Sequence, residues 1–212
     1  MIIPFTNELR SAMAREIDKK LHDLRRSQII DAAAECFIEN GFHQTGMQQI
    51  CKKVKMGAGS VYHYFSNKDE IIEAISKEFG ADTVKFINSI KRNCDFIEGY
   101  LKAVSASLRQ TQKYSHYGRL VVEIYAESFR NNEVKQILRL LDQEAITELQ
   151  ALIKQAKSTK QISSNHDAHI LAHMLIALLE GLEDRILQNP GIKLKKLLNI
   201  HEDICRQLLN PD

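Results

Sequence analysis

Residues 41–70 read GFHQTGMQQICKKVKMGAGSVYHYFSNKDE, and this stretch decides the fold. Thr45 with Gln48 three residues later fits a capping box, so we expect a helix to begin after Thr45. A turn at residues 55–57 contains a glycine, and a second short helix is expected at residues 58–65. Two short helices joined by a three-residue turn are typical of a helix-turn-helix.

The same stretch has an uneven charge. No Asp or Glu occurs between Phe42 and Lys68, although 27 of the 212 residues are acidic and the net charge is only +2. The basic side chains in this interval are Lys52, Lys53, Lys55, Lys68, His43 and His63. A local acid-free basic surface indicates contact with the phosphates of nucleic acid. Ordinary solvated lysines are the alternative interpretation.

The second short helix has the composition of a recognition helix. Small residues at its start allow close approach to base edges, and polar aromatic tips follow. Val61 and Phe65 lie four residues apart and should face the core. Tyr62 and Tyr64 are alternatively core residues, but four of five consecutive residues cannot all face one way.

Helix ends extend this candidate site. Thr45 at the start of one helix and Lys68 in the first turn of the next are placed to hold phosphates. The predicted DNA-contacting residues are Thr45, Lys55, Gly59, Ser60, Tyr62, His63, Tyr64 and Lys68.

The rest of the chain predicts an all-α protein. Three prolines, nine glycines and no tryptophan leave few helix breakers, and no alternating strand pattern occurs. Gly41 can end the first helix in a left-handed cap, and Asn67 with Glu70 forms a further capping box. Helices are expected at residues 25–40, 46–54, 58–65, 67–79, 81–92, 95–112, 118–129, 132–157, 167–188 and 193–209.

Three regions follow from these elements. Residues 1–24 are interpreted as a charged, partly mobile N-terminal arm, with a solvated tail as the simplest reading. Residues 25–80 are expected to form the helix-turn-helix domain, including the start of a linking helix. Residues 81–212 are expected to form a larger helical domain.

Composition also excludes several classes of protein. We expect no signal peptide, and no apolar run reaches the roughly 18 residues of a membrane span. The four cysteines, Cys36, Cys51, Cys94 and Cys205, have no paired spacing, so buried, reduced thiols in a cytoplasmic protein are expected.

Metal and enzyme chemistry find little support. His166, His169 and His173 share one helix face, but no third-helix ligand is identifiable, so no metal site is predicted. No catalytic grouping or phosphate-binding glycine loop is recognisable, so we expect neither an enzyme nor a cofactor.

The last two helices and the middle helices suggest two further surfaces. The helix at 167–188 is apolar over a face wider than one core contact needs, so with the following helix it predicts a four-helix dimer interface, against the alternative of an internal core. The residues predicted for this dimer interface are Ile170, Met174, Leu178, Leu182, Leu197 and Ile204. A small-molecule pocket is expected from Tyr100, Tyr114, Tyr117, Glu123, Tyr125 and Met174, with core or surface aromatics as the alternative.

Several motifs resemble the TetR family of bacterial transcriptional repressors. They are Gly41-Phe42, Thr45, Ile50, the string Gly59-Ser60-Val61-Tyr62-His63-Tyr64-Phe65, and Lys68-Asp69-Glu70. Residues 122–134 and 177–182 are similar to segments of regulators of the AcrR and BetI type. The resemblance implies a three-helix DNA-binding head, a helical domain that dimerises and binds a ligand, and DNA contacts by Thr45, Gly59, Tyr62, His63, Tyr64 and Lys68.

Two positions depart from the family pattern. Lys55 stands where the family usually has glycine, which predicts mild strain if φ is positive. Gly57-Ala58 replaces the usual Ser-Lys or similar pair, which removes a capping hydroxyl and a base-reading side chain.

The function we expect is a homodimeric repressor that a small-molecule effector releases from a palindromic duplex operator. One alternative is a DNA-binding activator or a regulator controlled by a partner protein. The other is a helical carrier or enzyme with a vestigial DNA head.

Overall fold

The computed structural model describes residues 7–92, 95–113, 115, 118–189 and 191–210. Within these residues all regular secondary structure is helical, which confirms the all-α prediction. By its contacts the chain divides into two compact units, residues 1–75 and 76–212. Cys94, Tyr114, Tyr117 and the first six residues of the predicted arm lie outside the described residues.

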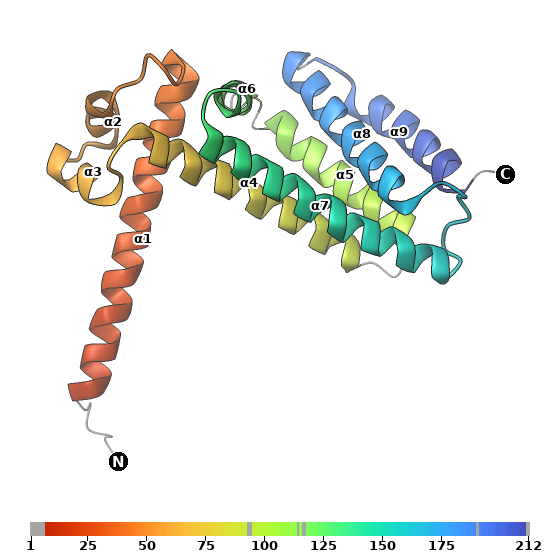
Figure 1. Ribbon diagram of the computed structural model, residues 1–212, viewed down its shortest axis with the longest axis horizontal. Coiled ribbons are helices and arrows are strands. Elements are labelled where there is room, and N and C mark those ends of the chain that lie inside the picture. The colour runs from red at the N-terminus through yellow and green to blue at the C-terminus, as the bar shows by residue number, and fades with distance from the viewer. Residues whose placement is uncertain (1–6, 93–94, 114, 116–117, 190, 211–212) are drawn as a thin grey trace. The chain divides into compact units, whose positions relative to one another are not determined.

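The N-terminal unit is a three-helix bundle. It contains α1 (Asn7–Asn40), α2 (Met47–Val54), α3 (Ala58–Tyr64) and the first turns of α4 (Lys68–Lys91). In Figure 1, α2 and α3 lie beside the C-terminal half of α1. The core side chains are almost fully buried and come from each of these helices and from the connections after α1 and α3: Ile29, Ala33, Phe37, Phe42, Ile50, Val61, Phe65, Ile71 and Ile72.

The first helix is longer than predicted. It begins at Asn7 rather than near Arg25, so most of the expected arm is helical. No glycine or proline occurs between residues 7 and 40, and an i,i+4 ion pair joins Glu16 to Lys20 at 2.7 Å. The mixed charges that we interpreted as a solvated tail are therefore compatible with a continuous helix.

The helix ends show one correct capping prediction and one error. Asn67 caps α4, because its Oδ1 accepts the Glu70 N–H at 2.9 Å, while the Glu70 carboxylate accepts the Ser66 N–H at 2.8 Å. Thr45 does not cap α2. The N-cap is Gly46, and the side chain that reaches back is that of Gln49, whose Oε1 accepts the Gly46 N–H at 2.7 Å.

The two helices predicted at residues 67–79 and 81–92 are one helix, α4. Gly80 stands between the two predicted ranges, but a single glycine lowers helix stability by only about 1 kcal/mol and does not end a helix by itself. Gly41 does end one, because its φ of 78° lies in the left-handed region and its N–H donates to the Phe37 carbonyl at 2.8 Å.

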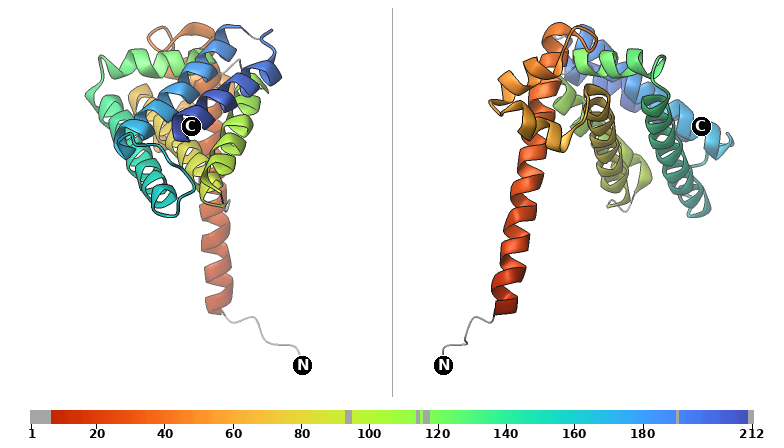
Figure 2. Two further views of the ribbon diagram at one scale, coloured as in Figure 1. Left: turned by 90° about the vertical axis from the view of Figure 1, so that its right-hand side faces the viewer. Right: turned by 60° about the vertical axis from the view of Figure 1, so that its left-hand side comes forward.

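The C-terminal unit holds the second half of α4 and five further helices. These are α5 (Phe96–Lys113), α6 (Gly118–Ser128), α7 (Asn132–Ser158), α8 (Ala168–Gln188) and α9 (Leu194–Leu209). The views in Figures 1 and 2 show α5, α8 and α9 side by side. Their common core includes Tyr100, whose hydroxyl donates to the Leu175 carbonyl at 2.8 Å and so ties α5 to α8.

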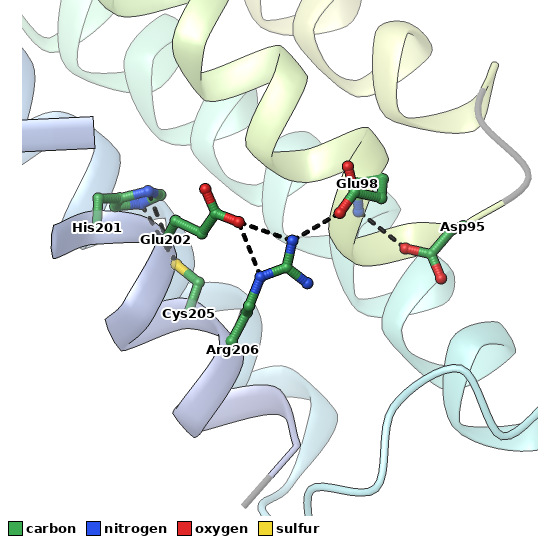
Figure 3. Close-up of polar contacts among 6 residues, drawn as sticks. All are labelled: Asp95, Glu98, His201, Glu202, Cys205 and Arg206. Carbon is green, nitrogen blue, oxygen red and sulfur yellow. Dashed lines mark hydrogen bonds and ion pairs between the residues drawn. The ribbon is translucent and has the colours of Figure 1, made fainter. Parts of the chain in front are cut away.

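The last helix is held to α5 by a charged contact at its edge. Figure 3 shows Arg206 between Glu98 of α5, at 2.6 Å, and Glu202 of its own helix, at 2.7 Å. Beneath it, Cys205 lies buried with its Sγ 3.4 Å from His201 Nε2. Burial raises the pKa of the Cys205 thiol to about 12 and lowers the pKa of His201, so both groups are uncharged near neutral pH.

Candidate nucleic-acid interface

The recognition helix α3 turns one face inward and one face outward. Val61 and Phe65 are buried, as predicted, at 0% and 3% exposure. Tyr62 is 49% exposed, and His63 is exposed beside it. The outward edge of α3 therefore carries a phenol and an imidazole on a backbone that the core holds fixed.

The N-terminal tip of α3 is open. Gly57, Ala58, Gly59 and Ser60 are all exposed, and no side-chain bond caps the helix. A Cβ added at Gly59 would meet no heavy atom within 4 Å. The positive end of the helix dipole lies at this exposed tip, which suits an anionic phosphate.

The turn before α3 has the strained backbone expected from the missing glycine. Lys55 lies at φ 58° and ψ 40°, in the left-handed region. The turn is closed by bonds from the Lys55 N–H to the Lys52 carbonyl, at 3.3 Å, and from the Met56 N–H to the Cys51 carbonyl, at 3.2 Å. Lys55 itself is exposed, so its ammonium is available on the same surface as α3.

The basic residues of the acid-free interval do not act alike. Lys53 is held between Glu35 and Glu39 of α1, at 2.9 and 2.8 Å, and hydrogen bonds to these carboxylates raise its pKa well above its usual value. Its charge is therefore compensated within the bundle. Lys52 and Lys55 are exposed as well.

Lys68 bonds the protein's own backbone. Its Nζ donates to the carbonyls of Phe42, His43 and Thr45 at 2.8, 3.2 and 3.3 Å, and lies 4.5 Å from the centre of the Phe42 ring. These contacts join the start of α4 to the loop between α1 and α2. The sequence suggested a phosphate contact here, whereas the geometry assigns Lys68 a structural role as well.

Thr45 is also directed inward. Its side chain is 1% exposed, and its hydroxyl donates toward the carbonyls of Cys36 and Gly41, at 3.1 and 2.9 Å. This occupation explains why Thr45 does not cap α2. Because its side chain is buried, it is not exposed for the predicted phosphate contact. Its two hydrogen bonds instead hold the loop between α1 and α2.

A residue outside the predicted set joins this surface. The ring of His22, on α1, lies 4.7 Å from the Tyr64 ring and 6.5 Å from the His63 ring. Tyr64 is half-buried. The signal that could have identified His22 is the helical spacing of Lys19, His22 and Arg26, which continues the first helix toward its N-terminus.

The residues predicted for a ligand pocket are dispersed among the described elements of the C-terminal unit. Tyr100 is fully buried in the core, Glu123 and Tyr125 lie on α6, and Met174 is 47% exposed on α8. Burial and the neighbouring carboxylates Glu180, Asp142 and Glu183 raise the pKa of Tyr125. The structure brings Tyr125 close to acidic side chains of α7 and α8, which the sequence did not predict.

Glu183 is the most enclosed of these carboxylates. Its Oε1 accepts hydrogen bonds from Ser107, at 2.5 Å, and Thr111, at 3.3 Å, both on α5. Burial raises its pKa, and the two hydroxyls offset part of that rise.

A separate cavity of about 190 Å³ lies between α4 and α7. Ile87, Ala145 and Leu141 supply an apolar lining, and the Lys91–Glu148 ion pair, at 2.5 Å, borders it. Of the residues predicted for a ligand pocket, the described ones, Tyr100, Glu123, Tyr125 and Met174, do not line it.

The predicted dimer residues include both exposed and partly buried side chains. Ile170, Met174 and Ile204 are 56%, 47% and 44% exposed. Leu178, Leu182 and Leu197 are half-buried and pack against the core. Ile200, which the sequence did not single out, is 60% exposed on α9.

The described residues contain neither a three-residue metal-binding group nor a helix that could cross a membrane. His169 and His173 lie with their Nε2 atoms 3.2 Å apart, but within this part of the chain no three His, Cys, Asp or Glu side chains are grouped to hold a metal ion. None of the described helices is long and apolar enough to cross a membrane. Cys36, Cys51 and Cys205 are buried free thiols.

Comparison with known proteins gives the family. The family model for bacterial regulatory proteins of the tetR family matches residues 29–75, and that for the C-terminal part of BetI-type transcriptional repressors matches residues 97–210. This chain belongs to the TetR family. It is therefore an HTH-type transcriptional regulator that binds DNA, and not an enzyme.

Relatives and solved structures agree with this membership. The HTH-type transcriptional regulator UidR of Escherichia coli is 30% identical over 158 residues, which cover 74% of this chain and 79% of UidR. Salmonella enterica GusR has a TM-score of 0.74 at 28% identity, over 87% of this chain and 95% of GusR. FadR of Bacillus subtilis, solved with stearoyl-CoA, has a TM-score of 0.73 at 22% identity, over 86% and 97%, and supports the fold.

Proposed function

We propose that this TetR-family regulator is a cytoplasmic, homodimeric repressor that a small-molecule effector releases from a palindromic operator. The observation that carries the proposal is the outward edge of α3. Tyr62 and His63 are exposed there, while Val61 and Phe65 hold the helix on the core from behind. The edge adjoins the open N-terminal tip and the exposed Lys52 and Lys55.

This surface favours duplex DNA over other polyanions. A short, narrow helix with a glycine-rich tip fits a major groove, and the flanking lysines and helix ends contact the phosphates on either side. Phosphate contacts position the head, whereas base contacts specify the sequence. With Gly57 and Ala58 at its tip, α3 has few side chains to read bases, so Ser60, Tyr62 and His63 are the proposed readers.

A second copy of the chain is the proposed partner of α8 and α9. Ile170 and Met174 on α8, and Ile200 and Ile204 on α9, are all exposed apolar side chains, and Figure 1 shows the two helices side by side. Apolar residues of this size rarely gather in the open unless they bind a partner. A two-fold symmetric dimer would bind two half-sites of the operator, about one turn of DNA apart.

The effector is proposed to bind in the C-terminal unit. FadR has been solved with stearoyl-CoA and SmeT with triclosan, so proteins of this fold hold small molecules. In this chain the α4–α7 cavity is a candidate, because α4 also supplies the first turns that pack in the N-terminal unit. A ligand that favours one position of α4 would change DNA affinity through that helix.

The test begins with the operator. The full chain is used to select fragments of the genome that encodes it, and binding to a recovered duplex is measured from 50 to 300 mM salt. A steep, linear loss of log affinity with log salt is expected, with a two-fold symmetric footprint. No selection of any duplex by the folded chain would overturn the proposal.

The same duplex tests the reading edge. Tyr62→Ala should weaken binding by roughly five- to tenfold, the effect of losing about 1 kcal/mol of hydrogen bonding to DNA. Because Tyr62 is half-exposed, the Tyr62→Ala variant should have the same unfolding midpoint as the wild type. Tyr62→Phe separates the hydroxyl from the ring. Unchanged affinity in Tyr62→Ala contradicts the assignment.

A further inference from the structure

We propose that the N-terminal half of α1, residues 7–26, is a second DNA-contacting element that grips the phosphate backbone beside the site read by α3. The inference rests on the proposed function, because it extends the same interface. It concerns a segment that the sequence presented as a mobile tail.

The first step is the contact between α1 and α3. His22 lies against Tyr64 and His63, the last residues of α3, with ring centres 4.7 and 6.5 Å apart. Four residues on, the Arg26 guanidinium lies 5.0 Å from the centre of the Phe65 ring. The face of α1 that carries His22 and Arg26 is therefore continuous with the outward edge of α3.

The second step is the length of helix beyond that contact. Fifteen residues of α1 precede His22, from Asn7 to Leu21. At 1.5 Å per residue they extend about 22 Å, roughly two-thirds of a turn of duplex DNA. Figures 1 and 2 show this part of α1 continuing past α3, away from α2. A duplex docked on α3 would have this helix beside it.

The third step is the charge on each side of the helix. Lys19 lies three residues before His22 and Arg25 three after it, so both share the His22 side, and both are exposed. Lys20 lies two residues from His22, on the opposite side, where it pairs with Glu16 at 2.7 Å. Two exposed acids lie near these cations: Asp18, four residues before His22, and Asp23, whose carboxylate lies 3.6 Å from His22 Nδ1. Lys19, Arg25 and Arg26 outnumber them, so the side that adjoins α3 has a net positive charge, which fits a phosphate backbone.

The fourth step is the rival occupant. Leu21 and Leu24 are 50% and 55% exposed. Leu24 lies on the side opposite His22, and Leu21 lies four residues before Arg25, at the edge of the charged side. They could accept a protein partner. The charged side is favoured for DNA because it alone is continuous with the reading edge, whereas the leucines offer two isolated apolar side chains.

The experiment compares basic residues on the two sides of α1. Binding to a 40-base-pair duplex of mixed sequence and to the selected operator is measured against salt for the wild type, Lys19→Ala, Arg25→Ala and the control Lys20→Ala. Each lost phosphate contact should reduce the salt slope by about 0.9 per protomer, hence by about 2 for a bound dimer. Lys20→Ala, which removes the same charge from the far side, should leave the slope unchanged.

A footprint locates the contact. Hydroxyl-radical protection of the backbone just outside each half-site should be lost in Lys19→Ala and kept in Tyr62→Ala at saturating protein. Trimming those flanking base pairs should weaken the wild type severalfold and the Lys19→Ala variant little.

The outcomes separate the two proposals. A wild type that binds neither duplex overturns both. A wild type that binds, with salt slopes equal in Lys19→Ala, Arg25→Ala and Lys20→Ala, overturns this inference and leaves the proposed function intact. An effect confined to a Leu21→Ala, Leu24→Ala double variant, seen as a changed oligomeric state, also overturns it and assigns the helix to a protein partner.

Discussion

At the scale of single residues, side chains of the same type have different roles. Lys52, Lys53, Lys55 and Lys68 all lie in one acid-free interval, yet Lys53 is paired with two carboxylates and Lys68 bonds three carbonyls. A lysine can bind a phosphate only if the fold leaves its ammonium exposed and not already paired. The sequence shows the charge, and the neighbours from α1 decide where it is used.

Lys68 is predicted to stabilise the N-terminal unit. Lys68→Met keeps the aliphatic packing on Phe42 but removes the ammonium that bonds the loop carbonyls. Because hydrogen bonds from a charged group contribute about 1.5–3 kcal/mol when enclosed, and Lys68 is half-exposed, the expected loss is about 1–2 kcal/mol. Denaturant unfolding measures it. The exposed Lys52→Met is the control, and equal stability of both variants would contradict the role.

Lys55 is predicted to lower the free energy of unfolding of the protein and to strengthen its binding to DNA. A non-glycine residue in the left-handed region costs about 1 kcal/mol, so Lys55→Gly should raise the free energy of unfolding by up to that amount. It should also weaken operator binding, because an exposed ammonium is lost. Lys52→Gly, inside α2, should instead destabilise by about 1 kcal/mol. Destabilisation by Lys55→Gly would show that the lysine makes a stabilising contact in the turn.

At the scale of elements, helix packing decides which side chains become chemically distinctive. Glu183 is one of many glutamates in the sequence, but α5 encloses it with Ser107 and Thr111. Tyr125 of α6 meets carboxylates from α7 and α8 only because three helices converge. No local sequence pattern predicts such contacts, because they join residues that are far apart in the chain.

Glu183 predicts a pH dependence of stability. Burial raises its pKa in the folded state above the unfolded value. Its protonated form thus stabilises the fold below the unfolded pKa, and that contribution is lost as pH rises through the folded pKa. Glu183→Gln should therefore raise the melting temperature near pH 7 and show little gain near pH 4. Thermal unfolding across this range tests it, with the exposed Asp203→Asn as control. A gain independent of pH would refute this explanation.

At the scale of the whole molecule, the apolar surface of α8 and α9 predicts a dimer. Met174→Asp should give a monomer in sedimentation measurements and weaken operator binding at least tenfold, because the two heads no longer bind as one unit. Leu140→Asp, at a 64% exposed position on α7, is the control for adding an acid to an exposed apolar site. Dimerisation unchanged in Met174→Asp would place the interface elsewhere.

The sequence by itself determined the all-α class, the helix-turn-helix, and the inward side of α3. These are local properties, because helical spacing, glycine and capping residues act within a few positions of one another. Val61 and Phe65 are buried, Gly41 ends α1 and Asn67 caps α4 for reasons readable in the neighbouring letters.

The tertiary structure alone decided how the polar residues are used. Thr45 and Lys68 bond backbone carbonyls of the N-terminal bundle, and Lys53 is neutralised by α1. The predicted N-terminal tail proved to be helix through most of its length, and it brings His22 to the recognition helix. The physical reason is that a polar side chain has several possible partners, and only packing between distant segments selects which one it meets.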